Sequence, residues 1–160
     1  MVEQELIDGL VVISTLIYNS LLTAVFVFRA FDWEAWEKRM GIPFNLLLIP
    51  FSILWVLNVL NGWDFARLGM STVIVIFLLY DLWYRTLTKE KPRHHPKKWP
   101  TKLIIYMILL QVGSITLNGY GFLISKEIGL IVLATYFLSL FAFAFYQFRF
   151  KKQERITFNR

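Results

Sequence analysis

The sequence predicts an all-α, polytopic membrane protein with five transmembrane helices, and three observations lead to this fold class. Hydrophobic residues make up 57% of the 160-residue chain, which is more apolar surface than one small soluble core can bury. These residues fall in five long runs, each about long enough to cross a hydrocarbon layer of roughly 30 Å. The runs also lack strict alternation of apolar and polar residues, so they favour helices over the strands of a closed barrel.

Each predicted span is one of these apolar runs. We expect a single transmembrane domain with cytosolic loops at 29–42 and 85–102 and a basic cytosolic tail at 149–160. The first loop contains the sequence Phe-Asp-Trp-Glu-Ala-Trp-Glu-Lys-Arg, which suits a short helix lying in the headgroup plane. The second loop is rich in Lys, Arg, His and Pro, which is typical of an irregular, solvated segment. The predicted spans cover residues 9–28, 43–61, 68–84, 103–118 and 128–148.

The distribution of Lys and Arg predicts the orientation of the spans. Three of these residues lie in loop 29–42, seven in loop 85–102 and five in the tail, whereas the opposite side holds only Arg67 and Lys126. Cytosolic segments carry an excess of Lys and Arg, so we expect the carboxyl terminus in the cytosol and the amino terminus outside. The acidic first residues lack the basic start of a signal peptide, so the first apolar run is expected to remain as a span.

Aromatic residues near the ends of the spans agree with these boundaries, because amphipathic rings prefer the membrane–water interface. We interpret six of them as interfacial anchors: Trp33, Trp36, Trp83 and Trp99 on the cytosolic side, and Trp63 and Tyr120 on the outer side.

The net charge of +6 is concentrated beside the apolar spans. Basic residues in such positions usually set topology and contact anionic lipid headgroups, so we expect the lipid bilayer as a partner and no nucleic acid. The chain contains no cysteine, which excludes disulfides and thiolate metal sites. We expect no metal and no cofactor.

A repeated motif suggests that the spans form two similar hairpins. Leu-Asn-Gly-Trp-Asp-Phe begins at Leu60 and Leu-Asn-Gly-Tyr-Gly-Phe begins at Leu117, at an offset of 57 residues that also aligns Pro43 with Pro100. This spacing predicts a parallel repeat of spans 2–3 and spans 4–5, of the kind found in membrane transporters. Alternatively, Asn and Gly simply end two helices, which is their usual role.

Polar residues close to the repeated motif are the candidate ligand-binding residues at an outer mouth. Their amides and carboxylate suit a polar ligand group, although helix capping and turn geometry are the simpler explanation. The candidates are Asn58, Asn61, Asp64 and Asn118.

Polar residues inside the spans have simpler explanations. Asn19 and Gln111 lie at the same predicted depth, so an interhelical hydrogen bond between them is expected, worth about 0.6 kcal/mol in membranes. Asp81 and Arg85 are four residues apart on one helix face, which predicts an intrahelical ion pair. A proton-relay role is the alternative for Asp81, because acids inside membranes often have a function.

These observations favour a non-catalytic membrane protein that acts by binding. It would serve as an accessory subunit of a larger membrane assembly, through partner membrane subunits or self-association, or hold an apolar ligand among its aromatic helices. The alternative is a small oligomeric transporter or channel with a polar outer mouth, which the repeat supports. A membrane enzyme is the third possibility, but the sequence has no paired carboxylates within a span and no Ser-His-Asp set near the membrane core.

Overall fold

The computed structural model describes residues 4–60, 64–87 and 101–158, and side chains within 4–60, 64–84 and 101–149. This part of the chain is entirely helical outside short turns. Five helices are long and apolar enough to cross a membrane, because α2 and α3 together form one of them. The all-α fold and the five candidate spans are therefore confirmed. The helices are α1 (Gln4–Ala30), α2 (Glu34–Leu46), α3 (Leu48–Leu60), α4 (Phe65–Leu87), α5 (Thr101–Ile124) and α6 (Lys126–Phe158).

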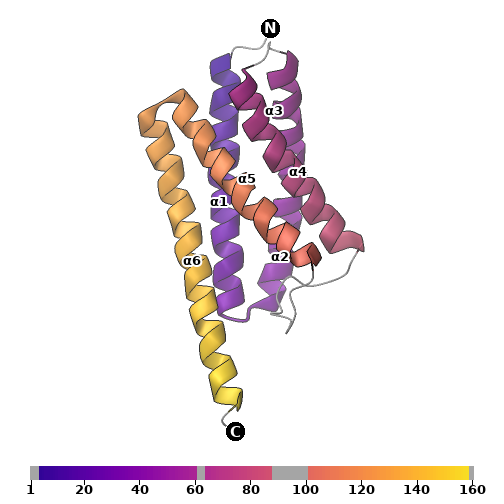
Figure 1. The fold of residues 1–160 in the computed structure, drawn as a ribbon, viewed down its shortest axis with the longest axis vertical. Coiled ribbons are helices and arrows are strands. Elements are labelled where there is room, and N and C mark those ends of the chain that lie inside the picture. The colour runs from indigo at the N-terminus through magenta and orange to yellow at the C-terminus, as the bar shows by residue number, and fades with distance from the viewer. Residues whose placement is uncertain (1–3, 61–63, 88–100, 159–160) are drawn as a thin grey trace.

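The junction between α2 and α3 is a local irregularity caused by proline. Pro50 has no N–H to donate to the carbonyl of Leu46, one helical turn earlier. The chain compensates with a tighter turn, in which the N–H of Leu47 donates to the carbonyl of Phe44 over 3.3 Å. Leu47 itself keeps right-handed helical angles, so α3 continues in the direction of α2 (Figure 1).

The five spans form an antiparallel bundle in which α1 is central. Figure 1 shows the amino terminus at one end of the bundle and the carboxyl terminus at the other. We call these the amino-terminal end, which also carries the α5–α6 turn, and the carboxyl-terminal end. Helix α1 packs against α6, α2, α3 and α5, and α4 packs against α2, α3 and α5. The most extensive contact joins α1 to α6, the first helix to the last.

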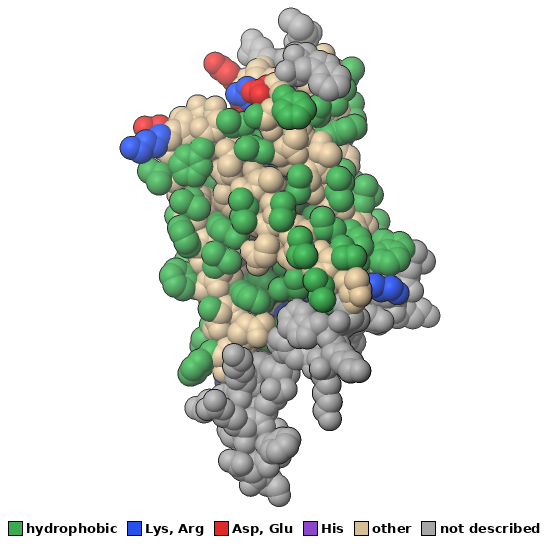
Figure 2. Space-filling model, in the orientation of Figure 1, with side chains coloured by type: hydrophobic (Ala, Val, Ile, Leu, Met, Phe, Trp, Pro, Cys, Tyr) green, Lys and Arg blue, Asp and Glu red, His purple; other side chains and the backbone are tan. Residues whose placement is uncertain are grey.

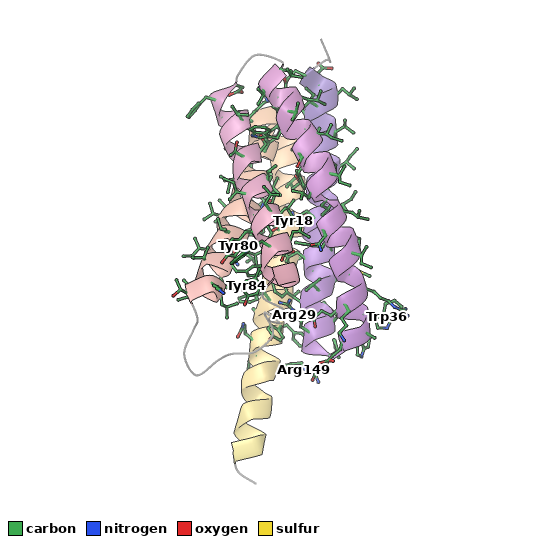
Figure 3. All side chains as sticks on the ribbon, turned by 90° about the vertical axis from the view of Figure 1, so that its right-hand side faces the viewer. Tyr18, Arg29, Trp36, Tyr80, Tyr84 and Arg149 are labelled. Carbon is green, nitrogen blue, oxygen red and sulfur yellow. The ribbon has the colours of Figure 1, made fainter. Side chains whose placement is uncertain are left out.

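Aromatic side chains fill the middle of the bundle. The Tyr18 ring of α1 lies 5.4 Å from Phe44 of α2 and 6.4 Å from Phe77 of α4, measured between centroids. Phe77 in turn lies 5.7 Å from Tyr106 of α5. Ring pairs of this kind stabilise a fold by about 0.5–1.5 kcal/mol each beyond the area they bury, so this group ties four helices together. Figure 3 shows Tyr18 inside the bundle, near the middle of its length.

The outer surface of the bundle is apolar along the whole length of the spans. Figure 2 shows hydrophobic side chains spread over the visible face, with the charged side chains near its two ends. Phe141 and Phe148 of α6 are 71% and 72% exposed, and Ile42 of α2 is 67% exposed. Water-soluble monomers rarely expose apolar patches of this extent. The surface is therefore compatible with an integral membrane location.

The turn between α1 and α2 is shorter than the predicted loop at 29–42. Only residues 31–33 lie outside helices there, so most of the segment expected to lie in the headgroup plane belongs to α2 instead. The N–H of Trp33 donates to the carbonyl of Phe28 over 2.9 Å, and the N–H of Asp32 donates to that of Arg29. Asp32 has a positive φ of 58°, which completes a Schellman-type helix end. This capping permits a three-residue turn, which the charged sequence did not predict.

The turn between α5 and α6 consists of Ser125 alone. Its side-chain oxygen accepts a hydrogen bond from the N–H of Ile128 over 3.1 Å, which is the usual N-cap interaction. Helix α6 then continues for 33 residues. At 1.5 Å per residue it is about 50 Å long, and it projects beyond the bundle (Figure 1). The predicted basic tail at 149–160 is thus helical as far as Phe158.

Candidate functional site

The amino-terminal end of the bundle contains a buried carboxylate, Asp8 of α1, with only 6% of the residue exposed. One of its oxygens accepts hydrogen bonds from Gln4 Nε2 and from the hydroxyl of Tyr120, both over 2.9 Å. The other oxygen lies 3.1 Å from a guanidinium nitrogen of Arg67. Asp8 therefore joins α1 to α4 and α5, and both of its oxygens have partners.

Arg67 connects this carboxylate to the start of α4. A second guanidinium nitrogen donates to Asp64 over 2.7 Å, so the arginine lies between two acids. The side chain of Asp8 is 9% exposed, whereas that of Asp64 is 43% exposed. Asp64 also accepts a hydrogen bond from the N–H of Ala66, which caps the amino end of α4. The three charged side chains have a net charge of −1.

Two of the predicted outer-mouth residues thus belong to one network. Asn58 of α3 is 5% exposed, and its Oδ1 accepts a long hydrogen bond of 3.4 Å from Gln4. Asp64 takes part through Arg67. We call Gln4, Asp8, Asn58, Asp64, Arg67 and Tyr120 the outer cluster.

The other two predicted outer-mouth residues lie elsewhere. Asn118 is buried, and its Nδ2 donates over 2.6 Å to the carbonyl of Ser114 on its own helix. Its Oδ1 has no hydrogen-bond partner among the described residues. Asn61 lies outside the described residues, so whether Asn61 and Asn118 are equivalent stays a prediction.

The predicted contact between Asn19 and Gln111 is wrong. Asn19 is fully buried, and its Nδ2 donates over 2.9 Å to Thr135 Oγ1 of α6. Gln111 Oε1 accepts a hydrogen bond from Tyr136 of the same helix over 3.1 Å. Both amides therefore bind neighbouring residues of α6. Depth along the span was estimated correctly, but residue counting does not reveal which helix lies alongside.

Asp81 is more completely buried within the bundle than its sequence position suggested, since none of its surface is exposed. The Arg85 side chain is outside the described residues, and so is the predicted ion pair. A further interhelical hydrogen bond lies between Asp8 and Asp81 along the bundle, because the Tyr18 hydroxyl is 3.1 Å from Ser114 Oγ. Polar groups are thus buried at three depths in this bundle.

The predicted anchors differ in their exposure. Trp33, Trp36 and Trp83 are 51%, 49% and 39% exposed, and Figure 3 shows Trp36 pointing away from the bundle. Tyr120 is instead 1% exposed, and its hydroxyl donates to Asp8. Its interpretation as an interfacial anchor is therefore wrong, because a protein carboxylate occupies the place expected for water. Trp63 and Trp99 lie outside the described residues.

The outer cluster keeps one charged group, the Asp8 carboxylate, buried inside the bundle. An ionised carboxylate in an apolar interior is costly unless it is paired and hydrogen-bonded, and Asp8 satisfies both conditions. The donors Arg67 Nε and Asn58 Nδ2 have no partner among the described residues. No group of three His, Asp or Glu side chains within 4–60, 64–84 and 101–149 is arranged to bind a metal ion.

The sequence carries one signal for the Asp8–Arg67 pair, which the predicted span boundaries hide. The first span was predicted to begin at Gly9, which placed Asp8 just outside it. Arg67 and Lys126 are the only basic residues expected on the outer side, so an acid at the start of one span and an arginine at the start of another were natural partners. Helix α1 actually begins at Gln4, one turn before Asp8.

No protein-family model matches this sequence, and no curated protein or solved structure matches it. The function must therefore be inferred from the residues and their geometry.

Proposed function

We propose that the chain is a non-catalytic integral membrane protein that acts by binding, as an accessory subunit of a larger membrane assembly. The observation that carries this proposal is the contrast between a filled interior and an apolar outer surface. Tyr18, Phe44, Phe51, Phe77 and Tyr84 are each at most 2% exposed and occupy the space between the helices. This packing favours a partner on the outer surface over an apolar ligand in the interior.

Two outer faces of the bundle differ in chemistry. The α2–α3 face is aliphatic, with Ile49, Ile53 and Val56 between 45% and 57% exposed. The α6 face is aromatic, with Phe137 and Phe141 48% and 71% exposed. Aromatic residues are enriched in protein–protein contacts relative to other surfaces. We therefore propose that α6 faces the partner subunit and that α2–α3 faces lipid.

Site-specific photo-crosslinking in native membranes tests this proposal. A photoreactive phenylalanine analogue replaces Phe141 on the α6 face in one variant. In a matched control, the same analogue replaces Ile53 on the α2–α3 face. We expect one defined membrane protein, identified by mass spectrometry, to be crosslinked from position 141 and not from position 53. Crosslinks to lipid alone from both positions would contradict the proposal, and crosslinks to a second copy of the chain would assign self-association.

The second candidate function is a small oligomeric transporter or channel with a polar outer mouth. The outer cluster supports it, because charged groups within a transmembrane bundle usually line a path or bind a substrate. If the chain is such a transporter or channel, the N terminus lies outside and Arg67 lies at the entrance to the path. The parallel repeat of hairpins belongs to the same proposal, as does the orientation predicted from Lys and Arg.

A further inference from the structure

We propose that buried polar residues of α1, α4 and α5 form a route by which protons cross the bundle, with Asp8 and Asp81 as its terminal acids. The route goes beyond the binding function proposed above and does not depend on it, because it lies inside one chain. It would also supply the transported species for the second candidate function.

The outer part of the route is the hydrogen bond between Asp8 and Tyr120. A carboxylate and a phenol joined over 2.9 Å can exchange a proton along that bond, since the phenol both donates and accepts. Arg67 is positively charged and lies beside them, but Asp64 and Asp8 together outweigh it. The net charge of −1 at this end favours the approach of protons over that of anions.

The middle part is the pair of hydroxyls formed by Tyr18 and Ser114. They lie 3.1 Å apart, and either can be the donor, which is the property that a proton relay requires. Tyr18 is ten residues after Asp8 on α1, which is about 15 Å along the helix axis. Asn118 of α5 is one turn from Ser114 toward the outer cluster and is 4% exposed.

The gap between Tyr120 and Ser114 is where we expect water. Asn118 Oδ1 has no hydrogen-bond partner among the described residues, and an unsatisfied buried acceptor is costly. Buried waters usually satisfy such groups through about three hydrogen bonds. Thr15 of α1, which is 1% exposed, supplies a further hydroxyl between Asp8 and Tyr18 along the helix. A water at Asn118 would connect the outer and middle parts of the route.

The inner part leads from Tyr18 to Asp81. The Tyr18 ring packs edge-on against Phe77 of α4 at 6.4 Å, and Asp81 follows Phe77 by four residues on the same helix face. Asp81 is fully buried toward the carboxyl-terminal end. It is thus the last interior acid before that end of the bundle.

The chemistry needs no reagent other than the proton. At each step one O–H bond breaks and one forms as a proton passes to the next oxygen, and each hydroxyl or water gives up its own proton when it accepts another. The order from outside is Asp8, Tyr120, water at Asn118, Ser114, Tyr18 and Asp81. No oxidant, reductant or metal takes part.

The test uses the full chain in liposomes that contain a pH-sensitive dye, with a potassium gradient and valinomycin to set the membrane potential. We expect the dye to report proton entry well above that of protein-free liposomes. Tyr18→Phe keeps the ring contacts with Phe44 and Phe77 but removes the relay hydroxyl, so it should lower the flux at least tenfold. Tyr136→Phe is the matched control, because Tyr136 is a buried tyrosine hydrogen-bonded to Gln111 outside the route.

Three outcomes would overturn the proposal. These are a wild-type flux equal to that of empty liposomes, an unchanged flux in Tyr18→Phe, or equal losses in Tyr18→Phe and Tyr136→Phe. If Tyr18→Phe fails to fold, Ser114→Ala removes the other hydroxyl of the pair and decides the question by the same criteria. None of these results depends on a partner subunit, so failure of the route and failure of the binding function are distinguishable.

Discussion

The α3–α4 and α5–α6 hairpins carry the same Leu-Asn-Gly sequence near their turns, but different interactions hold them at the amino-terminal end of the bundle. The first hairpin is attached to α1 by charge, through Arg67 and Asp8. The second is held by a hydrogen bond from the uncharged Tyr120 hydroxyl to the same Asp8, by close packing and by a helix cap. A Cβ atom on Gly121 would lie 3.2 Å from the Cα of Gly129, so the α5 and α6 backbones nearly touch there. Similar local sequence therefore does not impose similar packing.

Gly69 and Gly129, which lie near the start of the second helix of each hairpin, show the same difference. Gly129 lies so close to the Phe122 ring that a Cβ atom would overlap it, whereas a Cβ atom on Gly69 would have no neighbour within 4 Å. These two residues match at an offset of 60 in the sequence. The repeat itself stays a prediction, because residues 61–63 lie outside the described part. The described ends of the hairpins are not equivalent in their packing.

The largest effect should come from removing the buried acid of the first hairpin's attachment. Asp8→Ala leaves Tyr120 without its acceptor, Gln4 with only the long hydrogen bond to Asn58 and Arg67 with only the exposed Asp64. Breaking a buried pair usually costs 3–5 kcal/mol, and since Arg67 keeps one partner we expect about 3 kcal/mol.

Asp64→Asn is the matched control for this change, because it keeps an oxygen that can cap α4 and removes only the exposed ion pair, which contributes roughly 0–1 kcal/mol. The free energy of unfolding of both variants can be measured by denaturation in mixed detergent micelles. Equal losses would mean that the pair with Asp8 is no more important than the exposed one, and that the first hairpin is not attached by charge.

The glycine positions should respond with opposite signs. Gly129→Ala forces the Phe122 ring or the α5–α6 contact to move, so overpacking should cost about 1–3 kcal/mol. Gly69→Ala meets no neighbour and reduces backbone entropy in the unfolded chain, so it should stabilise the protein by about 0.5–1 kcal/mol. Thermal unfolding in detergent compares the two directly. Destabilisation by both changes would show that the hairpins are packed alike after all.

The cap at the second turn should contribute less. Ser125→Ala removes the acceptor for the N–H of Ile128 and should cost about 1 kcal/mol. Ser20→Ala serves as the control, since Ser20 is exposed and its hydroxyl bonds only to the carbonyl of Leu16 in its own helix. The two melting temperatures should differ clearly. If they coincide, backbone packing alone holds the turn.

The smallest expected effect concerns the two interior amides. Asn19→Leu and Gln111→Leu should each cost about 0.6 kcal/mol, and the double change should be additive because the residues bind different partners on α6. Asn19→Leu combined with Thr135→Val should be less than additive, since these two side chains are hydrogen-bonded. Double-mutant cycles measure both couplings. A coupling energy between positions 19 and 111 would contradict the assignment of separate partners on α6 to the two amides.

Hydrophobic run length was sufficient to predict the number of spans and their approximate positions. It could not predict where the helices end, because capping decides that. The charged residues of 29–42 suggested a long loop, but the Schellman-type helix end at Asp32 makes that loop short. Likewise, Ser125 reduces the second tight turn to one residue.

The candidate site was only partly predictable for a different reason. Asn58 and Asp64 were identified from their position near a turn, but their partners depend on which helices pack together. Asp8 and Tyr120 are 112 residues apart in the chain, and no periodicity in the sequence links them. Tyr120 also shows that an aromatic residue near a span end is not always an interfacial anchor. When an acid lies within reach, its hydroxyl can bind that acid in place of water.

The contact between α1 and α6 has a consequence for how the protein is made. Asn19 acquires both of its interhelical hydrogen bonds from α6, from the Val132 carbonyl and from Thr135, which follows Asn19 by 116 residues. At the usual translation rate of about 5–20 residues per second, roughly 6–23 s separate the synthesis of Asn19 and Thr135. During that interval the first helix has neither its largest neighbour nor a partner for its buried amide. The newborn chain therefore passes through a stage at which its central helix still has an open side, and a ribosome stalled before α6 would leave a product that quality-control proteases can distinguish from the finished bundle.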